Sequence, residues 1–185
     1  MHPVYGYELL KDVDQIGSVA AHIPFQHHER QDGRGYPRGL RGSNKIDMGS
    51  LTGLLKFHEG DKLIILAEIA AIADFYDACI SDRPYRRGLP PDLVFELIKS
   101  GSGSQFNEEL VGCFLKVVPK YPVGYEIKVK CGEYTGFTGV VASFNPYQLS
   151  HPKILLLNDN QTNKIKSIEI DLSTYSGFIE IDCIG

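Results

Sequence analysis

The spacing of apolar residues changes partway along the chain. From Pro3 to about Val118 they recur at intervals of three and four, which is typical of amphipathic helices. From Tyr125 onward, short runs of β-branched and aromatic residues alternate with turn residues, which indicates strands. Two prolines and a glycine separate the two patterns within residues 119–124. The sequence therefore predicts an α+β protein, with a helical domain over residues 1–119 and a small antiparallel β-sheet or barrel over residues 120–185.

The helical part is predicted to contain helices over residues 4–13, 19–29, 62–80, 93–99 and 107–118. Pro3 suits the start of the first helix, and Ser18 and Asp61 are the expected caps of the second and third. Pro24 must kink the second helix or delay its start. Residues 43–60 show no strong pattern, so we interpret them as an inserted loop.

The β part is predicted to contain strands over residues 125–131, 137–144, 153–159, 164–171 and 177–182. The His151–Pro152 pair is predicted to form a turn.

Composition narrows the class of protein. The chain has 185 residues, of which 43% are hydrophobic and 23% charged, as in ordinary soluble globular proteins. Its longest apolar run, residues 63–73, contains Glu68 and is shorter than the ~20 residues that a membrane span needs. The N-terminus lacks the features of a secretory signal, and the net charge of −4 argues against general affinity for nucleic acids. We expect a cytoplasmic protein with no membrane contact, whose four widely spaced cysteines are reduced.

The segment HHERQDGRGYP, residues 27–37, carries the strongest chemical signal. Imidazole and carboxylate are ligands of borderline divalent metals such as iron, manganese and zinc, whereas arginine suits phosphate oxygens. Neighbouring histidines on a helix point about 100° apart, so we expect His27 and His28 to serve adjacent ions rather than one. Arginines gather in two places, at residues 30, 34, 38 and 41 and at residues 83, 86 and 87. The segment therefore predicts metal-assisted chemistry on a phosphate.

Two aspartates stand out in the longest predicted helix. Asp74 and Asp77 share one face with several alanines at spacings of three and four. An unpaired charge buried among small apolar side chains is costly, so a metal or another cation should accompany it. Metal ligation by Asp74 is the favoured interpretation, and a salt bridge to an arginine such as Arg83 is the alternative.

The strings HHERQDGRGYPRGL, ADFYDACISDRPYR and GSQFNEELVGCFL resemble the HD-GYP domain, a subgroup of the HD metal-dependent phosphohydrolases. The similarity spans roughly residues 2–118, and HPVYGYELL looks like the family segment in which a His-Pro pair opens a helix. The resemblance implies an HD-type helical bundle with two or three metal ions, often iron or manganese. It also implies hydrolysis of the bacterial second messenger cyclic di-GMP to pGpG or GMP.

Carried over by position, the resemblance makes His2, His27, His28 and Asp74 metal ligands. It places Asp77, Arg83, Arg86 and Tyr36 near the substrate. Gly35, Tyr36 and Pro37 correspond to the family's signature loop, which is also linked to contacts with diguanylate cyclase (GGDEF) domains. Asn107 replaces a usual aspartate, and either residue can cap the next helix.

One departure from the family pattern affects the predicted activity. The half that carries the His-Asp dyad would lie upstream of His2, where this sequence has only Met1. We interpret the chain as a piece of a longer enzyme, with a truncated gene product as the alternative. Catalytic residues are therefore not assigned, turnover is expected to be weak or absent, and the remaining ligands should hold at most one ion. Apolar surface left uncovered on the first and third predicted helices could be hidden in a homodimer.

Two other functions stay open. The chain could be a non-catalytic adaptor that binds a diguanylate cyclase domain through Gly35, Tyr36 and Pro37. It could also belong to an HD-type phosphohydrolase that acts on another cyclic nucleotide.

Overall fold

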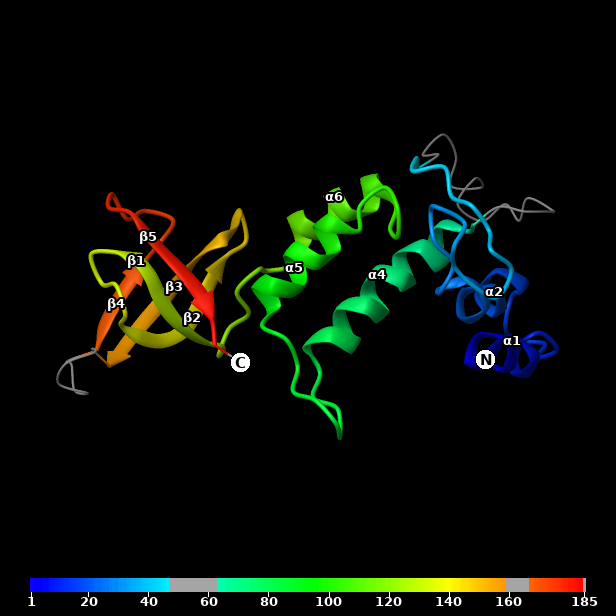
Figure 1. The fold of residues 1–185 in the computed structure, drawn as a ribbon, viewed down its shortest axis with the longest axis horizontal. Helices are drawn as coiled ribbons and strands as arrows, with labels where there is room; N and C mark the ends of the chain where they lie inside the picture. The colour runs from blue at the N-terminus through cyan, green and yellow to red at the C-terminus, as the bar shows by residue number, and fades with distance from the viewer. Residues whose placement is uncertain (47–62, 159–166, 185) are drawn as a thin grey trace. The chain divides into compact units, whose positions relative to one another are not determined.

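The computed structural model describes residues 1–46, 63–158 and 167–184 (Figure 1). The chain divides into two compact units. The first contains Met1–Ala78 and Leu97–Phe114, and the second contains Cys79–Glu96 and Leu115–Gly185. The described residues exclude Asp61 and residues 47–60 of the predicted insertion, which contain His58. The predicted cap at Asp61 is therefore untested.

The described helices agree closely with the predicted ones. They are α1 (His2–Leu10), α2 (Ser18–Gln26), α4 (Ile65–Ile80), α5 (Pro91–Ser100) and α6 (Glu108–Val117). Proline stands in the first turn of α1, as its fixed φ and missing N–H favour. None of the described helices is both long and apolar enough to cross a membrane.

The ends of α2 differ from the prediction. Gly17 is the N-cap and Ser18 is already helical, without a side-chain capping bond, so the predicted cap at Ser18 is wrong. Pro24 lies inside the helix, which ends at Gln26. His27 and His28 therefore follow the helix instead of belonging to it.

The first unit is held together by apolar contacts between helices and by a side-chain cap. The ring of Tyr7 in α1 lies 4.9 Å from that of Phe25 in α2, centroid to centroid. Phe75 of α4 makes an edge contact with buried Phe106, at 5.2 Å. The Asn107 side chain accepts hydrogen bonds from the backbone N–H groups at 109 and 110, so the expected cap of α6 is confirmed.

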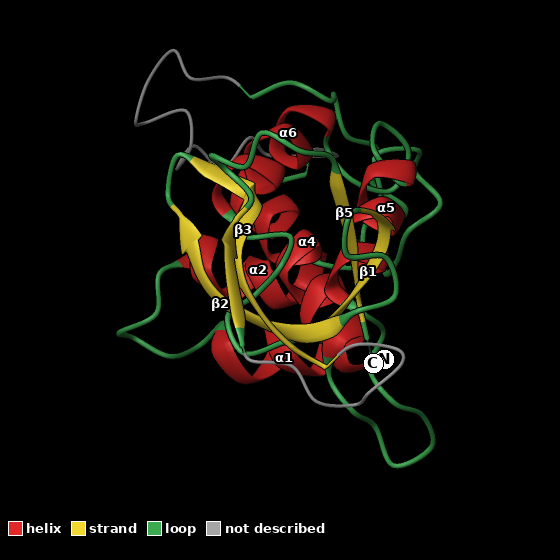
Figure 2. Ribbon diagram, turned by 90° about the vertical axis from the view of Figure 1, so that its left-hand side faces the viewer, coloured by secondary structure: helices red, strands yellow, loops and turns green. Residues whose placement is uncertain are grey.

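The second unit contains one antiparallel sheet, drawn in yellow in Figure 2. Its strands are β1 (Glu126–Gly132), β2 (Thr138–Asn145), β3 (Gln148–Asn158), β4 (Ile168–Asp171) and β5 (Ile179–Cys183), in the order β4-β3-β2-β1-β5. Alternate side chains of these strands are buried, as expected for a sheet with one covered face. The core that they form includes Ile127, Val129, Val141, Ile154, Leu156, Ile170 and Ile181.

Two details of the sheet could not be read from the sequence. His151 and Pro152 lie within β3, so the predicted turn there is wrong. The backbone of the edge strand β5 is bonded by side chains, since the Tyr121 hydroxyl donates to the carbonyl of Ile181 and Asp92 accepts from the N–H of Cys183. Side chains that occupy backbone groups of an edge strand protect it from pairing with other chains.

Candidate metal centre

Three histidines, here called the histidine cluster, bring their ring nitrogens together. The Nε2 atom of His2, in the first turn of α1, lies 3.1 Å from Nε2 of His27 and 3.0 Å from Nε2 of His28. One nitrogen atom from each of the three rings lies within 4.8 Å of the nitrogen atoms of the other two. The described residues thus contain a group able to hold a metal ion, made of three of the four predicted ligands.

The prediction that His27 and His28 project from a helix, about 100° apart, is wrong. It assumed a continuous helix, whereas α2 ends at Gln26 and the chain turns there, with the N–H of Glu29 donating to the carbonyl of Gln26 at 2.8 Å. In this turn both imidazoles reach the same ring of His2.

Two features of the cluster favour cation binding. Nδ1 of His27 lies 2.8 Å from the carbonyl oxygen of Pro24, so this nitrogen carries the proton and Nε2 presents a lone pair. Burial lowers the pKa of His28, and the neighbouring rings of His27 and His2 lower it further. Imidazole nitrogens gathered in this way are a ligand set for a divalent cation.

Asp74 lies outside this close cluster. Its side chain on α4 is exposed, so the expectation that it is buried among alanines is wrong. Its charge still acts on the cluster, because it raises the pKa of His28 against the larger lowering effects. Asp77 is exposed as well.

The signature loop, Gly35 to Pro37, folds back onto the cluster. The N–H of Tyr36 donates to the carbonyl of His28 at 3.2 Å, and the two rings stack at 4.8 Å with an angle of 27° between their planes. A Cβ atom at Gly35 would lie 2.5 Å from backbone atoms of Glu29 and Arg30, so only glycine fits this approach. The peptide bond before Pro37 is cis.

Glu29 holds the far side of this loop, a role that the sequence reasoning missed. Its carboxylate is 4% exposed and accepts hydrogen bonds from the N–H groups of Arg38, at 2.6 Å, and Leu40, at 2.8 Å. A carboxylate placed directly after two histidines and before a glycine-rich turn was the available signal. It could equally have been interpreted as a ligand.

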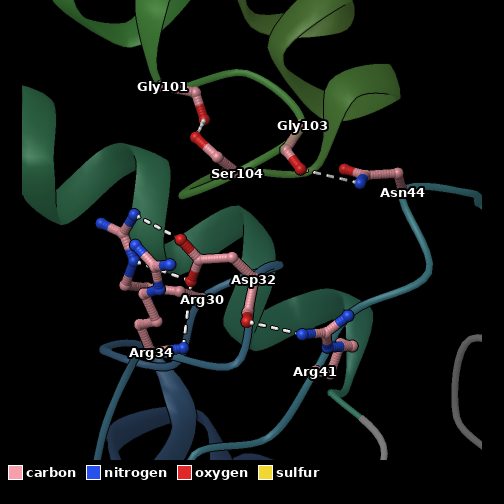
Figure 3. Close-up of polar contacts among 8 residues, drawn as sticks. All are labelled: Arg30, Asp32, Arg34, Arg41, Asn44, Gly101, Gly103 and Ser104. Atoms are coloured by element: carbon pink, nitrogen blue, oxygen red, sulfur yellow. Dashed lines mark hydrogen bonds and ion pairs between the residues drawn. The ribbon is translucent and has the colours of Figure 1, made fainter.

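The arginines of this region are partly engaged within the protein. Figure 3 shows Arg30, Arg34 and Arg41 gathered around Asp32. The guanidinium of Arg30 makes two bonds to the Asp32 carboxylate, at 3.0 and 2.8 Å, and Arg41 donates to the Asp32 carbonyl. The Arg30 pair and the N–H of Arg34 hold the pKa of Asp32 well below its usual range. Arg30 is therefore paired inside the loop, whereas residues 34, 38 and 41 are exposed.

The second arginine group lies in the other unit. Arg83 and Arg86 form a tight backbone turn in which each N–H donates to the other residue's carbonyl. Both side chains are exposed. Burial raises the pKa of the Cys79 thiol, and the guanidinium of Arg86 beside it acts in the opposite direction.

Comparison with known proteins extends these observations. No family model matches the chain. The chain is 29% identical over 153 residues to a cyclic di-GMP phosphodiesterase of Pseudomonas aeruginosa, covering 83% of this chain and 31% of the relative. It is 35% identical over 117 residues to a cyclic di-GMP phosphodiesterase of Thermotoga maritima, covering 63% of this chain and 27% of the relative. It is also 25% identical over 124 residues to 3'3'-cGAMP-specific phosphodiesterase 3 of Vibrio cholerae, covering 67% of this chain and 23% of the relative.

These matches confirm the resemblance to the HD-GYP phosphodiesterases that the motifs predict. The chain spans less than a third of the length of these relatives.

Proposed function

We propose that this chain contributes to a metal-dependent phosphodiesterase that hydrolyses cyclic di-GMP to pGpG or GMP in bacterial signalling. The observation that carries the proposal is the convergence of three imidazole Nε2 atoms from two separate segments. The relatives named as cyclic di-GMP phosphodiesterases support the choice of substrate.

Imidazole nitrogens are ligands of borderline divalent metals, and the resemblance to the HD-GYP domain favours iron or manganese among them. A divalent cation held there supplies charge stabilisation for phosphate oxygens and lowers the pKa of a water molecule.

The chain's own residues bind and orient the substrate in this proposal. Asp74 completes the ligand set, and the exposed face of Tyr36 stacks on a guanine base. Asp77, Arg83 and Arg86 contact the substrate, with the two guanidinium groups on its phosphates. Four ligands hold one ion, whereas in-line displacement commonly uses two, so we expect slow or no turnover by this chain alone.

The first test measures metal and hydrolysis together. The purified chain should bind close to one equivalent of Mn²⁺ in calorimetric titration, and His27→Ala should abolish this binding. His151→Ala is the matched control, because His151 is exposed in β3 of the other unit. Hydrolysis should be assayed with both cyclic di-GMP and 3'3'-cGAMP. If the two variants bind Mn²⁺ equally well, the histidine cluster is not a metal site.

A second candidate function is a non-catalytic adaptor for diguanylate cyclase (GGDEF) domains. It is favoured by the exposed side chains of Tyr36 and Arg38 on a loop whose backbone is fixed by Glu29. An adaptor should bind a cyclase domain without metal, and Tyr36→Ala should weaken that binding while His27→Ala leaves it unchanged. Dependence of cyclase binding on Mn²⁺ would contradict the adaptor function.

We also propose that the chain forms a homodimer through α1. Tyr5 and Leu9 lie one turn apart on this helix and are 67% and 76% exposed. Tyr5→Glu should then convert a dimer into a monomer in sedimentation equilibrium, and a monomeric unsubstituted chain would contradict the proposal.

A further inference from the structure

A half-buried carboxylate outside the histidine cluster joins three segments of the first unit. Glu68 of α4 accepts a hydrogen bond from Nε2 of Gln31 and another, at 3.2 Å, from Nδ2 of Asn107. Gln31 is 4% exposed and Asn107 1%, so neither amide can exchange its bond for one to water at low cost. Burial raises the pKa of Glu68, and the two amide donors act against that shift.

The two amides are fixed in orientation by their other partners. The Gln31 oxygen accepts from the N–H of Asn44 at 3.0 Å. The Asn107 oxygen accepts from the N–H groups of Glu109 and Leu110 at the start of α6. Each amide therefore has only its NH₂ group to offer Glu68, and each NH₂ group bonds to a different oxygen of the carboxylate, which satisfies both.

This arrangement connects the elements that carry the candidate ligands. Gln31 follows His28 by three residues, and Glu68 precedes Asp74 by six residues on α4. We propose that Glu68 is a positioning residue, which holds α4, the helix that carries Asp74, in register with the segment after His28. This inference rests on the proposed function in one respect, namely that the cluster binds a divalent cation.

Replacing Glu68 or Asn107 alone should break a hydrogen bond of the network, and replacing both together should restore the hydrogen bonds. In Glu68→Gln, the new NH₂ group faces an NH₂ group of Gln31 or Asn107, and neither partner can flip without losing its own backbone bond. In Asn107→Asp, two carboxylates face each other. In the double variant, the amide at 68 accepts from Gln31 and donates to the carboxylate at 107, which still caps α6. The negative charge then lies at a helix N-terminus, where it is favourable.

The experiment is a double-substitution cycle read by calorimetric titration with Mn²⁺. Each single variant should weaken Mn²⁺ binding by about tenfold or more, the scale found when groups that support metal ligands are altered. The double variant should bind within about threefold of the unsubstituted chain, because its hydrogen bonds are restored. Glu108→Gln is the matched control for Glu68→Gln, since it removes the same charge from an exposed residue beside the network and should leave binding unchanged. Circular dichroism establishes that each variant is folded.

A second readout separates this inference from the proposed function. Hydrogen exchange of the Asn44 amide, which bonds to Gln31, reports the network without any metal. Exchange should be faster in both single variants and slow again in the double variant. If the unsubstituted chain binds Mn²⁺ and all variants bind it equally, the positioning role is overturned and the metal site stands. If the unsubstituted chain binds no Mn²⁺, the metal site fails. Asn44 exchange then decides the positioning role, which stands if exchange follows the predicted cycle and is overturned if it does not.

Discussion

The hydrogen bonds of the Glu29 carboxylate allow a quantitative prediction about the loop beside the histidine cluster. Its carboxylate oxygens bond separately to the N–H groups of Arg38 and Leu40. In Glu29→Gln, the side chain keeps its shape and its amide oxygen can accept one of these bonds. The NH₂ group then points at the other N–H, so one buried donor loses its acceptor.

The magnitude follows from the burial of these groups. A hydrogen bond to a charged group contributes about 1.5–3 kcal/mol, and a buried donor without a partner costs about 1–3 kcal/mol. Removing the buried charge offsets part of this loss, because a neutral amide is cheaper to desolvate. We expect Glu29→Gln to lower the free energy of unfolding by about 2 kcal/mol. For a chain of this size, that corresponds to a fall in melting temperature of about 4–8 °C.

The assay is thermal unfolding followed by far-ultraviolet circular dichroism, which reports the helices of the first unit. Glu8→Gln is the control, because Glu8 also makes a short ion pair, at 2.6 Å to Lys11, but on the exposed surface of α1. Exposed pairs contribute little, so this variant should melt like the unsubstituted chain. Equal melting temperatures for the two variants would refute the view that Glu29 secures the loop.

Three further predictions concern other parts of the chain. Gly35→Ala should destabilise the chain by about 1–3 kcal/mol in urea titration, because the added Cβ meets backbone atoms at 2.5 Å. Gly112→Ala is the control, because a Cβ there enters open space on α6 and should stabilise the chain by about 0.5–1 kcal/mol. Effects of the same sign would contradict this explanation. The pKa of Asp32 is lowered in the folded chain, so its contribution to stability is fully present above the unfolded pKa of about 3.8. It declines below that pH and is lost only as the pH falls through the lower folded pKa. The melting temperatures of the unsubstituted chain and Asp32→Asn should therefore converge progressively in strong acid, and a constant difference would be the contrary result. Tyr121→Phe removes the buried hydroxyl that donates to the carbonyl of Ile181. It should lower the free energy of unfolding by about 1 kcal/mol in urea titration and speed amide exchange in β5. Unchanged exchange would show that this hydrogen bond does not stabilise the edge strand.

The sequence by itself determined the elements and most of the candidate ligands. Helices and strands were predictable because each is specified by the local periodicity of apolar residues, which is visible within a window of ten to twenty positions. The histidines were predictable because adjacent imidazoles next to a glycine turn are chemically unusual, and the resemblance of the surrounding motifs added His2 to them. Asn107 was correctly expected to cap α6, since capping depends on only three or four neighbouring residues.

Only the tertiary structure decided which polar groups meet. The convergence of His27 and His28 on one ring depended on where α2 ends, a boundary that periodicity locates only within a few residues. The exposure of Asp74 could not be read from a stripe of alanines, because a helical face is buried only if another element covers it. The pairing of Arg30 with Asp32 and of Glu68 with Gln31 and Asn107 depends on side-chain directions and on contacts between distant positions, which a linear pattern does not contain. Local order is thus encoded by neighbours in sequence, whereas the chemistry of the site is set by neighbours in space.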